Sequence, residues 1–420
     1  MDCVVLKKII AKGNKVSYDY EYPASWIDYF DKKEDNLFFE YDFNVETIPQ
    51  SLLAVPFVAN MLTISMFENT EIHVDELDKA FYDCIPNVLN GFKKVYPEIN
   101  FRCRIIANKL VDNSYETTEN QLLAFTGGLD ATSAFATINR DNLTLVNIWG
   151  ADVKLNMLGR HDYQLKYFLD ISKKYNCDFK QIKSNLRFLF NESKIPYTRY
   201  FSNDWWCAVS HTIAIITSFT PLIFVLKAKS VFLGSSYKND LELHDDANNV
   251  LIVNEIKIAN CQNIRIVDDD LKRIDKIQNI VEKLNISDKN PISIFACWNH
   301  ENIVEGNCCN CEKCFRTIMD IKSQNLNPVY FGFNVDESIY PKIHYYLENN
   351  KVGISFWKDI QNEYLKNKKF WKKDKNLKWI LTFKFNKPKN KFIQKIVRPF
   401  VLIKRKFQAE IKKIKNKNER

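Results

Sequence analysis

The sequence holds two stretches whose residue types and spacing suit chemistry, and the first is a glycine pair. Thr126, Gly127, Gly128, Leu129 and Asp130 follow the apolar run 122–125 and precede an alanine-containing, helix-forming segment. Paired glycines let the backbone approach a ligand closely, and the unbonded N–H groups at a helix N-terminus bind anions. The stretch predicts a strand, a tight turn and a helix that hold a phosphate; a glycine turn without a ligand is the alternative. The turn lacks the lysine of a Walker loop and the spacing of a dinucleotide fingerprint.

The second stretch is a cluster of cysteines late in the chain. Three of them are separated by two residues each, and a fourth lies eleven positions before them. They are Cys297, Cys308, Cys311 and Cys314. Four thiolates suit a tetrahedral Zn²⁺ that is structural, because no position stays open for a catalytic water. An iron–sulfur cluster and ordinary thiols are the alternatives; Cys309 could replace Cys308, and His300 is a further candidate in a polar loop.

The elements around the glycine pair alternate between strand and helix. Strands are expected at 121–125, 143–149, 179–182 and 231–233, and helices up to residue 139, at 161–175 and at 205–226. This alternation predicts an α/β fold, a doubly wound parallel sheet with helices on both faces. Ligands of such sheets bind at the carboxyl ends of the strands.

Further polar residues follow strands of the same sheet. Asp152 comes after the second strand, and Gly234, Ser235 and Asp240 come after a later one. The carboxyl ends of parallel strands meet at one edge, so these residues are candidates for the same site. For Asp152 and Asp240 a solvated loop carboxylate is an equal alternative. Arg160 and His161 are interpreted as helix-start residues, and contact with the nucleotide or substrate is the alternative.

The stretch from Thr126 to Asp130 resembles the S-G-G-x-D-S signature of the PP-loop ATP pyrophosphatases, which have the HUP fold and include asparagine synthetase. The cysteine cluster, followed by Arg316, resembles the zinc module of 7-cyano-7-deazaguanine synthases in the same family, and the likeness covers roughly residues 121–325. One departure is Ala131, which stands where the family has a second hydroxyl.

The resemblance implies an ATP-dependent ligase or amidotransferase-like enzyme. It would adenylate a carboxylate or carbonyl of a small molecule, release pyrophosphate, and then admit ammonia or an amine. Asp130 would order the loop or bind Mg²⁺, and Ser133 would assist catalysis. The implied ATP-binding residues are Thr126, Gly127, Gly128, Leu129, Asp130, Thr132, Ser133, Asp152, Gly234, Ser235 and Asp240. Thr132 and Ser133 would replace the hydroxyl that is missing at Ala131. The alternative is an ATP-binding protein of this fold without turnover.

The remaining segments carry no comparable motif. Residues 1–115 are interpreted as a separate α+β unit, with strands at 4–10, 16–22, 37–43 and 101–110 and helices at 52–67 and 76–96. The predicted domains are then 119–290 for nucleotide binding, 291–330 for zinc and 331–420 for a C-terminal segment. The apolar runs 52–67 and 212–226 are expected to be buried helices that fall short of the roughly 20 residues that span a bilayer.

The net charge of +9 is distributed unevenly over the 420 residues. From Lys366 onward 21 Lys and Arg stand against 3 Asp and Glu, while the rest of the chain is mildly acidic. The tail 366–420 has apolar residues at helical spacing and predicts a basic amphipathic helix that binds an anionic membrane surface or RNA; a solvated tail is the alternative. With eleven cysteines and a charged start that is no signal peptide, we expect a cytoplasmic protein, peripheral to the membrane if the tail binds there.

Overall fold

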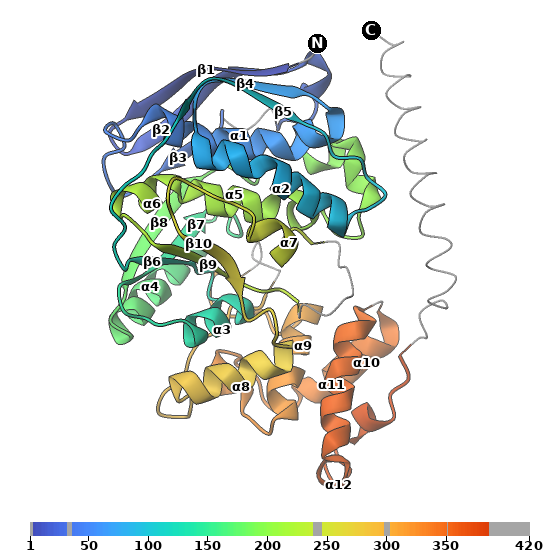
Figure 1. The fold of residues 1–420 in the computed structure, drawn as a ribbon. Helices are drawn as coiled ribbons and strands as arrows, with labels where there is room; N and C mark the ends of the chain where they lie inside the picture. Colours follow the sequence, from blue (N-terminus) through green and yellow to red (C-terminus); the bar gives the residue numbers. More distant parts are fainter. Residues whose placement is uncertain (1–2, 32–35, 238–245, 298–302, 351, 386–420) are drawn as a thin grey trace.

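The computed structural model describes residues 3–31, 36–237, 246–297, 303–350 and 352–385 (Figure 1). Within these ranges one mostly parallel sheet of ten strands runs through the molecule in the order β10-β9-β6-β7-β8-β3-β2-β1-β4-β5. Helices cover both of its faces, which confirms the expected α/β class.

The five strands on one side of the sheet are all parallel. They are β6 (Gln121–Ala124), β7 (Leu143–Trp149), β8 (Asp178–Ser184), β9 (Ser230–Gly234) and β10 (Asn263–Val267). In chain order their arrangement across the sheet is 3-2-1-4-5, because β9 pairs with the first strand, β6, on the side away from β7. The strand order reverses between β6 and β9, and this is where doubly wound sheets bind ligands.

Alternating side chains of β6 face two separate cores. Leu122 and Leu123 are both fully buried, and they belong to different apolar clusters. The first cluster includes α1 (Gln50–Glu68), α2 (Lys79–Val95), α5 (His211–Ser218) and α6 (Thr220–Val225). The second includes α3 (Leu129–Thr137), α4 (Leu158–Lys174), α8 (Arg273–Leu284) and α9 (Glu312–Ser323). The sheet is therefore the middle of three layers.

Residues 1–115 contribute the other half of the same sheet. Its strands are β1 (Cys3–Lys12), β2 (Lys15–Glu21), β3 (Phe38–Glu40), β4 (Glu71–Asp78) and β5 (Arg104–Val111). Strand β3 pairs antiparallel with β8 through Phe39 and Ser184, which joins the two halves. The N-terminal strands thus extend the sheet of the following segment, while the domain boundary at residue 115 stays a prediction.

Two apolar helical stretches are buried, as expected from the sequence. The stretches Gln50–Glu68 and Trp206–Val225 are long and apolar enough to cross a membrane by length and composition, so the expectation that both are too short was wrong. Of their most apolar windows, 89% and 83% are buried inside the protein. The second stretch begins with a π-helical turn, Trp206–Ser210, and continues through α5 and α6.

The C-terminal helices contribute side chains to the second core. They are α10 (Ile339–Asn349), α11 (Ile354–Lys366) and α12 (Lys368–Trp371). Trp371, Leu377 and Ile380 are buried, although the sequence placed the basic tail from Lys366 onward. The first part of that tail is therefore integral to the fold, since its apolar residues complete the core around α9 and α11. Its remainder, 386–420, lies outside the described residues.

Candidate functional site

A cavity of about 660 Å³ opens at the carboxyl ends of the parallel strands. Thr126, Gly128 and Asp130 line it from the loop after β6, and Gly234 lines it from the end of β9. The glycine turn thus lies where the strand order reverses, and it opens into a space large enough for a nucleotide-sized ligand.

Close packing requires two of the glycines. Gly127 has a φ of +70°, and a Cβ atom there would lie 2.8 Å from the ring of Phe295. At Gly234 a Cβ atom would lie 2.3 Å from the carbonyl oxygen of Asp130. Any side chain at either position would push the loop away from its neighbours.

The loop delivers the N-terminus of α3 to the cavity. Gly128 is the residue before the helix, and its N–H donates to Oγ1 of Thr126 over 3.3 Å. The first N–H groups of a helix have no acceptor within the helix. Leu129, Asp130 and Ala131 also line the cavity, so this end of α3 is positioned to bind an anion there.

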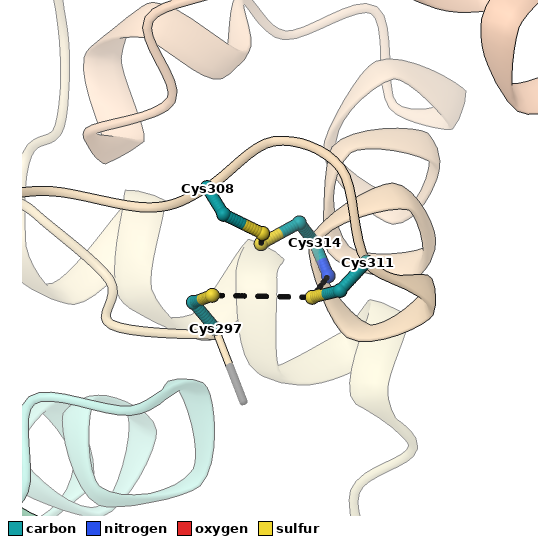
Figure 2. Close-up of side chains that lie close together, drawn as sticks. All are labelled: Cys297, Cys308, Cys311 and Cys314. Carbon is teal, nitrogen blue, oxygen red and sulfur yellow. Dashed lines mark hydrogen bonds between the residues drawn. The ribbon is translucent and has the colours of Figure 1, made fainter. Parts of the chain in front are cut away.

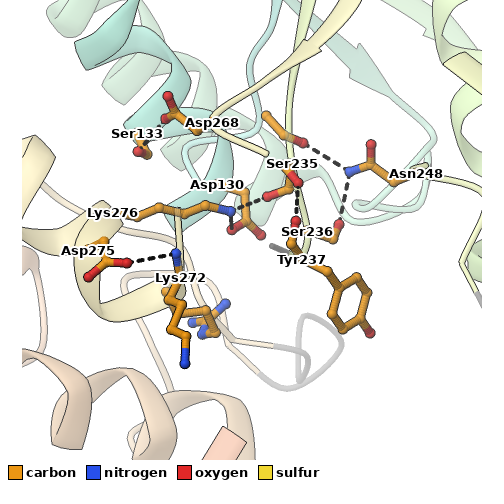
Figure 3. A network of polar contacts seen from close by, with 12 residues as sticks. Asp130, Ser133, Ser235, Ser236, Tyr237, Asn248, Asp268, Lys272, Asp275 and Lys276 are labelled. Carbon is orange, nitrogen blue, oxygen red and sulfur yellow. Dashed lines mark hydrogen bonds and ion pairs between the residues drawn. The ribbon is translucent and has the colours of Figure 1, made fainter. Parts of the chain in front are cut away.

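Asp130 forms an ion pair with a buried lysine of α8 (Figure 3). Nζ of Lys276 lies 2.9 Å from Oδ1 of Asp130 and also donates to the carbonyl oxygen of Ser235. Burial alone would raise the pKa of Asp130, but the charges of Lys276 and Arg273 outweigh it and hold this pKa below its usual value. The pair ties the loops after β6 and β9 together, which is the loop-ordering role considered for Asp130.

The two hydroxyls after Ala131 do not line the cavity. Ser133 is fully buried, and its Oγ donates over 2.5 Å to Asp268, which follows β10. Oγ1 of Thr132 is also buried and has no hydrogen-bond partner among the described residues. The helical turn carries both side chains toward the interior, so the geometry does not supply the phosphate contacts expected from them, nor a catalytic position for Ser133.

Ser235 belongs to the same hydrogen-bond network, but it is not among the residues that line the cavity. Its Oγ donates to the carbonyl oxygen of Tyr237, and the amide of Asn248 donates to Gly234 and Ser236 over 2.9 Å each (Figure 3). These bonds hold residues 235–237, directly after β9, in place. Asp240 lies outside the described residues.

Aromatic side chains at and beyond the end of β7 line the cavity. The rings of Trp149 and His161 are stacked, with centroids 3.8 Å apart and planes 22° apart. Nε2 of His161 lies 2.9 Å from Oε1 of Gln181 on β8, which fixes the imidazole. Asp152 follows β7 on the same side and pairs with Arg187 over 3.5 Å. Asp152 thus lines the cavity, while its contact with a nucleotide stays a prediction.

Two carboxylates, Asp204 and Asp246, also line the cavity. A hydrogen bond from Ala247 N to Cys207 O joins the segments that carry them, and Arg187 lies 4.0 Å from Asp204. Burial, and then the nearby charges of Asp130 and Asp204, raise the pKa of Asp246 to about 7. Burial lowers the pKa of His211 to about 4, so this imidazole is neutral at physiological pH.

Four cationic side chains line the cavity as well. They are Lys154, Arg187, Arg273 and Lys313. Sequence reasoning missed them, and it also missed Lys276. A signal for Lys276 existed, because it precedes the buried Ile280 by four residues and so shares the apolar face of an amphipathic helix.

The four predicted cysteines lie together at the edge of the second core (Figure 2). All four sulfur atoms are within 4.8 Å of one another. Sγ of Cys297 lies 4.0 Å from that of Cys311, and Sγ of Cys308 lies 3.8 Å from that of Cys314. Tetrahedral Zn²⁺ with bonds of about 2.3 Å requires sulfur atoms about 3.8 Å apart, so the cluster fits a zinc ion.

Backbone and side-chain groups hold the cysteine loop in shape. Backbone N–H groups of Asn310 and Cys314 donate to Cys308 and Cys311, as expected for thiolate ligands. Oδ1 of Asn307 accepts from the backbone N–H of Ala296 over 2.9 Å, which fastens the two segments that carry the ligands. Cys309 has a left-handed backbone and is not a member of the cluster, and His300 lies outside the described residues.

Arg160 supports the same loop from α4. Its side chain is buried, and Nη1 donates to the carbonyl oxygens of Val304 and Gly306 over 3.2 and 2.9 Å. The guanidinium therefore braces the cysteine loop instead of contacting the cavity, which extends its predicted role as a helix-start residue.

Comparisons of the chain with protein-family models, with curated proteins and with solved structures return no match.

Proposed function

We propose that the protein is an ATP-dependent ligase of the PP-loop pyrophosphatase type. It would transfer the adenylyl group of ATP to an oxygen of a small carboxylic acid or carbonyl compound. The single observation that carries this proposal is the glycine turn at Thr126 to Asp130, whose helix N-terminus opens into the cavity where the strand order reverses. The 3-2-1-4-5 strand order supports a HUP-type fold.

The reaction has two displacements. A substrate oxygen attacks the α-phosphorus of ATP, the bond to the β-phosphate oxygen breaks, and pyrophosphate leaves. Ammonia or an amine then attacks the activated carbon, and AMP leaves with the oxygen that it received. Neither step needs a protein nucleophile, so positioning and charge stabilisation supply the catalysis.

Each part of the cavity has a task in this scheme. The N–H groups at the start of α3 and the hydroxyl of Thr126 would hold the β- and γ-phosphates as they become pyrophosphate. The stacked pair of Trp149 and His161 would provide the surface for the base. The part of the cavity near Asp204 and Asp246 would receive the acceptor or its amine.

Mg²⁺ is proposed to arrive with the phosphates of ATP. In the described part of the chain, the four cysteines form the one group of three or more His, Cys, Asp or Glu side chains close enough to hold an ion. The carboxylate of Asp130 is already paired with Lys276, so it is not proposed as a Mg²⁺ ligand. A bound Mg²⁺ would neutralise charge on the leaving pyrophosphate.

A second candidate is an ATP-binding protein without turnover. It is favoured by Ala131, which removes a hydroxyl from the loop, and by Ser133, whose hydroxyl is held by Asp268. The two functions differ in their products, since binding alone yields no AMP.

The test is to incubate the zinc-loaded protein with ATP, Mg²⁺, ammonium and a library of small carboxylic acids. AMP and pyrophosphate in equal amounts, with a product whose mass equals that of the acid plus ammonia minus one water, would support the ligase. Tight ATP binding with no AMP from any acid would favour the second candidate, and absence of ATP binding would refute both. Asp130→Asn removes the ion pair with Lys276 that orders the loop, so this variant should lower pyrophosphate release.

A further inference from the structure

The cysteine module and the phosphate loop are packed against each other. The backbone N–H of Phe295 donates to the carbonyl oxygen of Gly127 over 2.8 Å, and the ring of Phe295 fills the space beside that glycine. Cys297 follows two residues later and lines the cavity itself. One wall of the candidate nucleotide site is therefore made by the segment that carries the first metal ligand.

The cysteine module also positions a cation at this wall. Helix α9 begins after Cys311, whose Sγ accepts the N–H of Cys314 over 3.5 Å. Lys313 lies between these two ligands in the first turn of α9, and it lines the same cavity as Thr126 and Gly128. A metal ion coordinated by Cys311 and Cys314 would fix the backbone on both sides of Lys313.

The neighbouring cation is held differently. Nη2 of Arg273 donates to Thr317 over 3.1 Å, and its Nε lies 3.5 Å from Asp320, so this guanidinium is anchored on α9. Lys276 is already paired with Asp130. Lys313 is thus the cation at this wall whose position depends on the metal ligands.

We propose that Lys313, positioned by the metal-bound cysteine module, binds the polyphosphate of the nucleotide, so that metal affinity and nucleotide affinity depend on each other. This inference rests on the proposed function for the identity of the nucleotide. A charge-assisted contact to a phosphate explains why a lysine stands between two ligand cysteines and faces a cavity that also receives a helix N-terminus.

The first experiment measures binding to zinc-loaded protein by calorimetry, with ATP, adenosine and inorganic tripolyphosphate as probes. Lys313→Met should weaken ATP and tripolyphosphate about 10- to 100-fold, the usual range for a lost charged hydrogen bond, and leave adenosine unchanged. Lys313→Arg should recover most of the affinity. Lys322→Met is the matched control, because Lys322 lies on the same helix but pairs with Glu337 away from the cavity.

The second experiment measures the coupling from the metal side. Saturating ATP should raise the affinity of the wild-type protein for Zn²⁺ in competition with a chelator, by the factor by which zinc raises ATP affinity. In Lys313→Met this coupling should shrink toward none. Zinc content and circular dichroism of each variant would show that the module is still formed.

The outcomes separate the inference from the proposed function. ATP binding that is unchanged in zinc-loaded Lys313→Met, or equal loss of ATP and adenosine binding, would overturn the inference and leave the proposed function standing. Tripolyphosphate binding through Lys313 without ATP binding would support the polyphosphate contact and overturn the proposed function. A wild-type protein that binds neither probe would overturn both.

Discussion

The ion pair between Asp130 and Lys276 should contribute strongly to stability, and it can be tested by a double-mutant cycle. Lys276 is fully buried, and the Asp130 side chain is 29% exposed. Asp130→Asn leaves a buried ammonium group without its carboxylate, which typically costs about 3–5 kcal/mol. Lys276→Met leaves a carboxylate that water can still reach, so we expect a smaller loss of about 1–3 kcal/mol.

The double variant should be more stable than the sum of the two losses predicts. Removing both charges leaves neither group buried and unpaired, so the coupling should reach about 1–3 kcal/mol. The assay is urea unfolding of the wild type, both single variants and the double variant. The exposed pair of Lys272 and Asp359, 3.3 Å apart, is the matched control, and its coupling should stay below about 1 kcal/mol.

The same pair predicts a dependence on pH. The folded-state pKa of Asp130 is lowered, so its contribution is present above the ordinary carboxyl pKa of about 4 and is lost as the pH falls through the folded-state value. Asp130→Asn should reduce the loss of stability in acid. Additive single losses, within about 0.5 kcal/mol, together with an unchanged acid profile would refute the reasoning.

Four further predictions concern the loop, the metal, Asp246 and the tail. In urea unfolding, Gly127→Ala should have a free energy of unfolding about 1–3 kcal/mol lower than Gly128→Ala, because of these two glycines only Gly127 has a positive φ. Equal stabilities of the two variants would contradict this. Cys314→Ser should lower zinc content measured by elemental analysis, and a wild type without metal would refute the site. Asp246→Asn should reduce the stability lost as the pH rises from about 4 to about 7, since the folded state favours the protonated acid. A chain ending at Phe385 should fold and bind ATP normally yet lose binding to phosphatidylserine vesicles or RNA; retained binding would remove the tail from both roles.

Local patterns were sufficient to predict four of the five strands in the parallel half of the sheet, while β10 was missed. Leu122 and Leu123 are both apolar because the strand is buried on both faces, and the glycines that follow mark its end. Strand β4 was missed even though Ile72 and Val74 alternate with polar residues. Its last residues, 76–78, were joined to the following helix, and 71–75 was assigned to no element. The antiparallel junction of β3 and β8 depends on residues about 145 positions apart, and no local pattern reports it.

The candidate site was predictable where the chemistry is local. The cysteine spacing predicted the cluster because a short loop and one helical turn bring the ligands together. The direction of Ser133 was not predictable, because it depends on which face of α3 Asp268 and α8 cover. Lys313 was missed for the same reason, since the cavity that it lines is assembled from distant strands.

The most direct test of the account is a crystal structure of the zinc-loaded protein with a non-hydrolysable ATP analogue bridged by a methylene between the α- and β-phosphorus atoms. The account predicts β- and γ-phosphate oxygens about 2.7–3.2 Å from backbone N–H groups between Gly128 and Ala131. A nucleotide whose phosphates lie away from this turn, or a cavity that stays without nucleotide at saturating concentration, would contradict it.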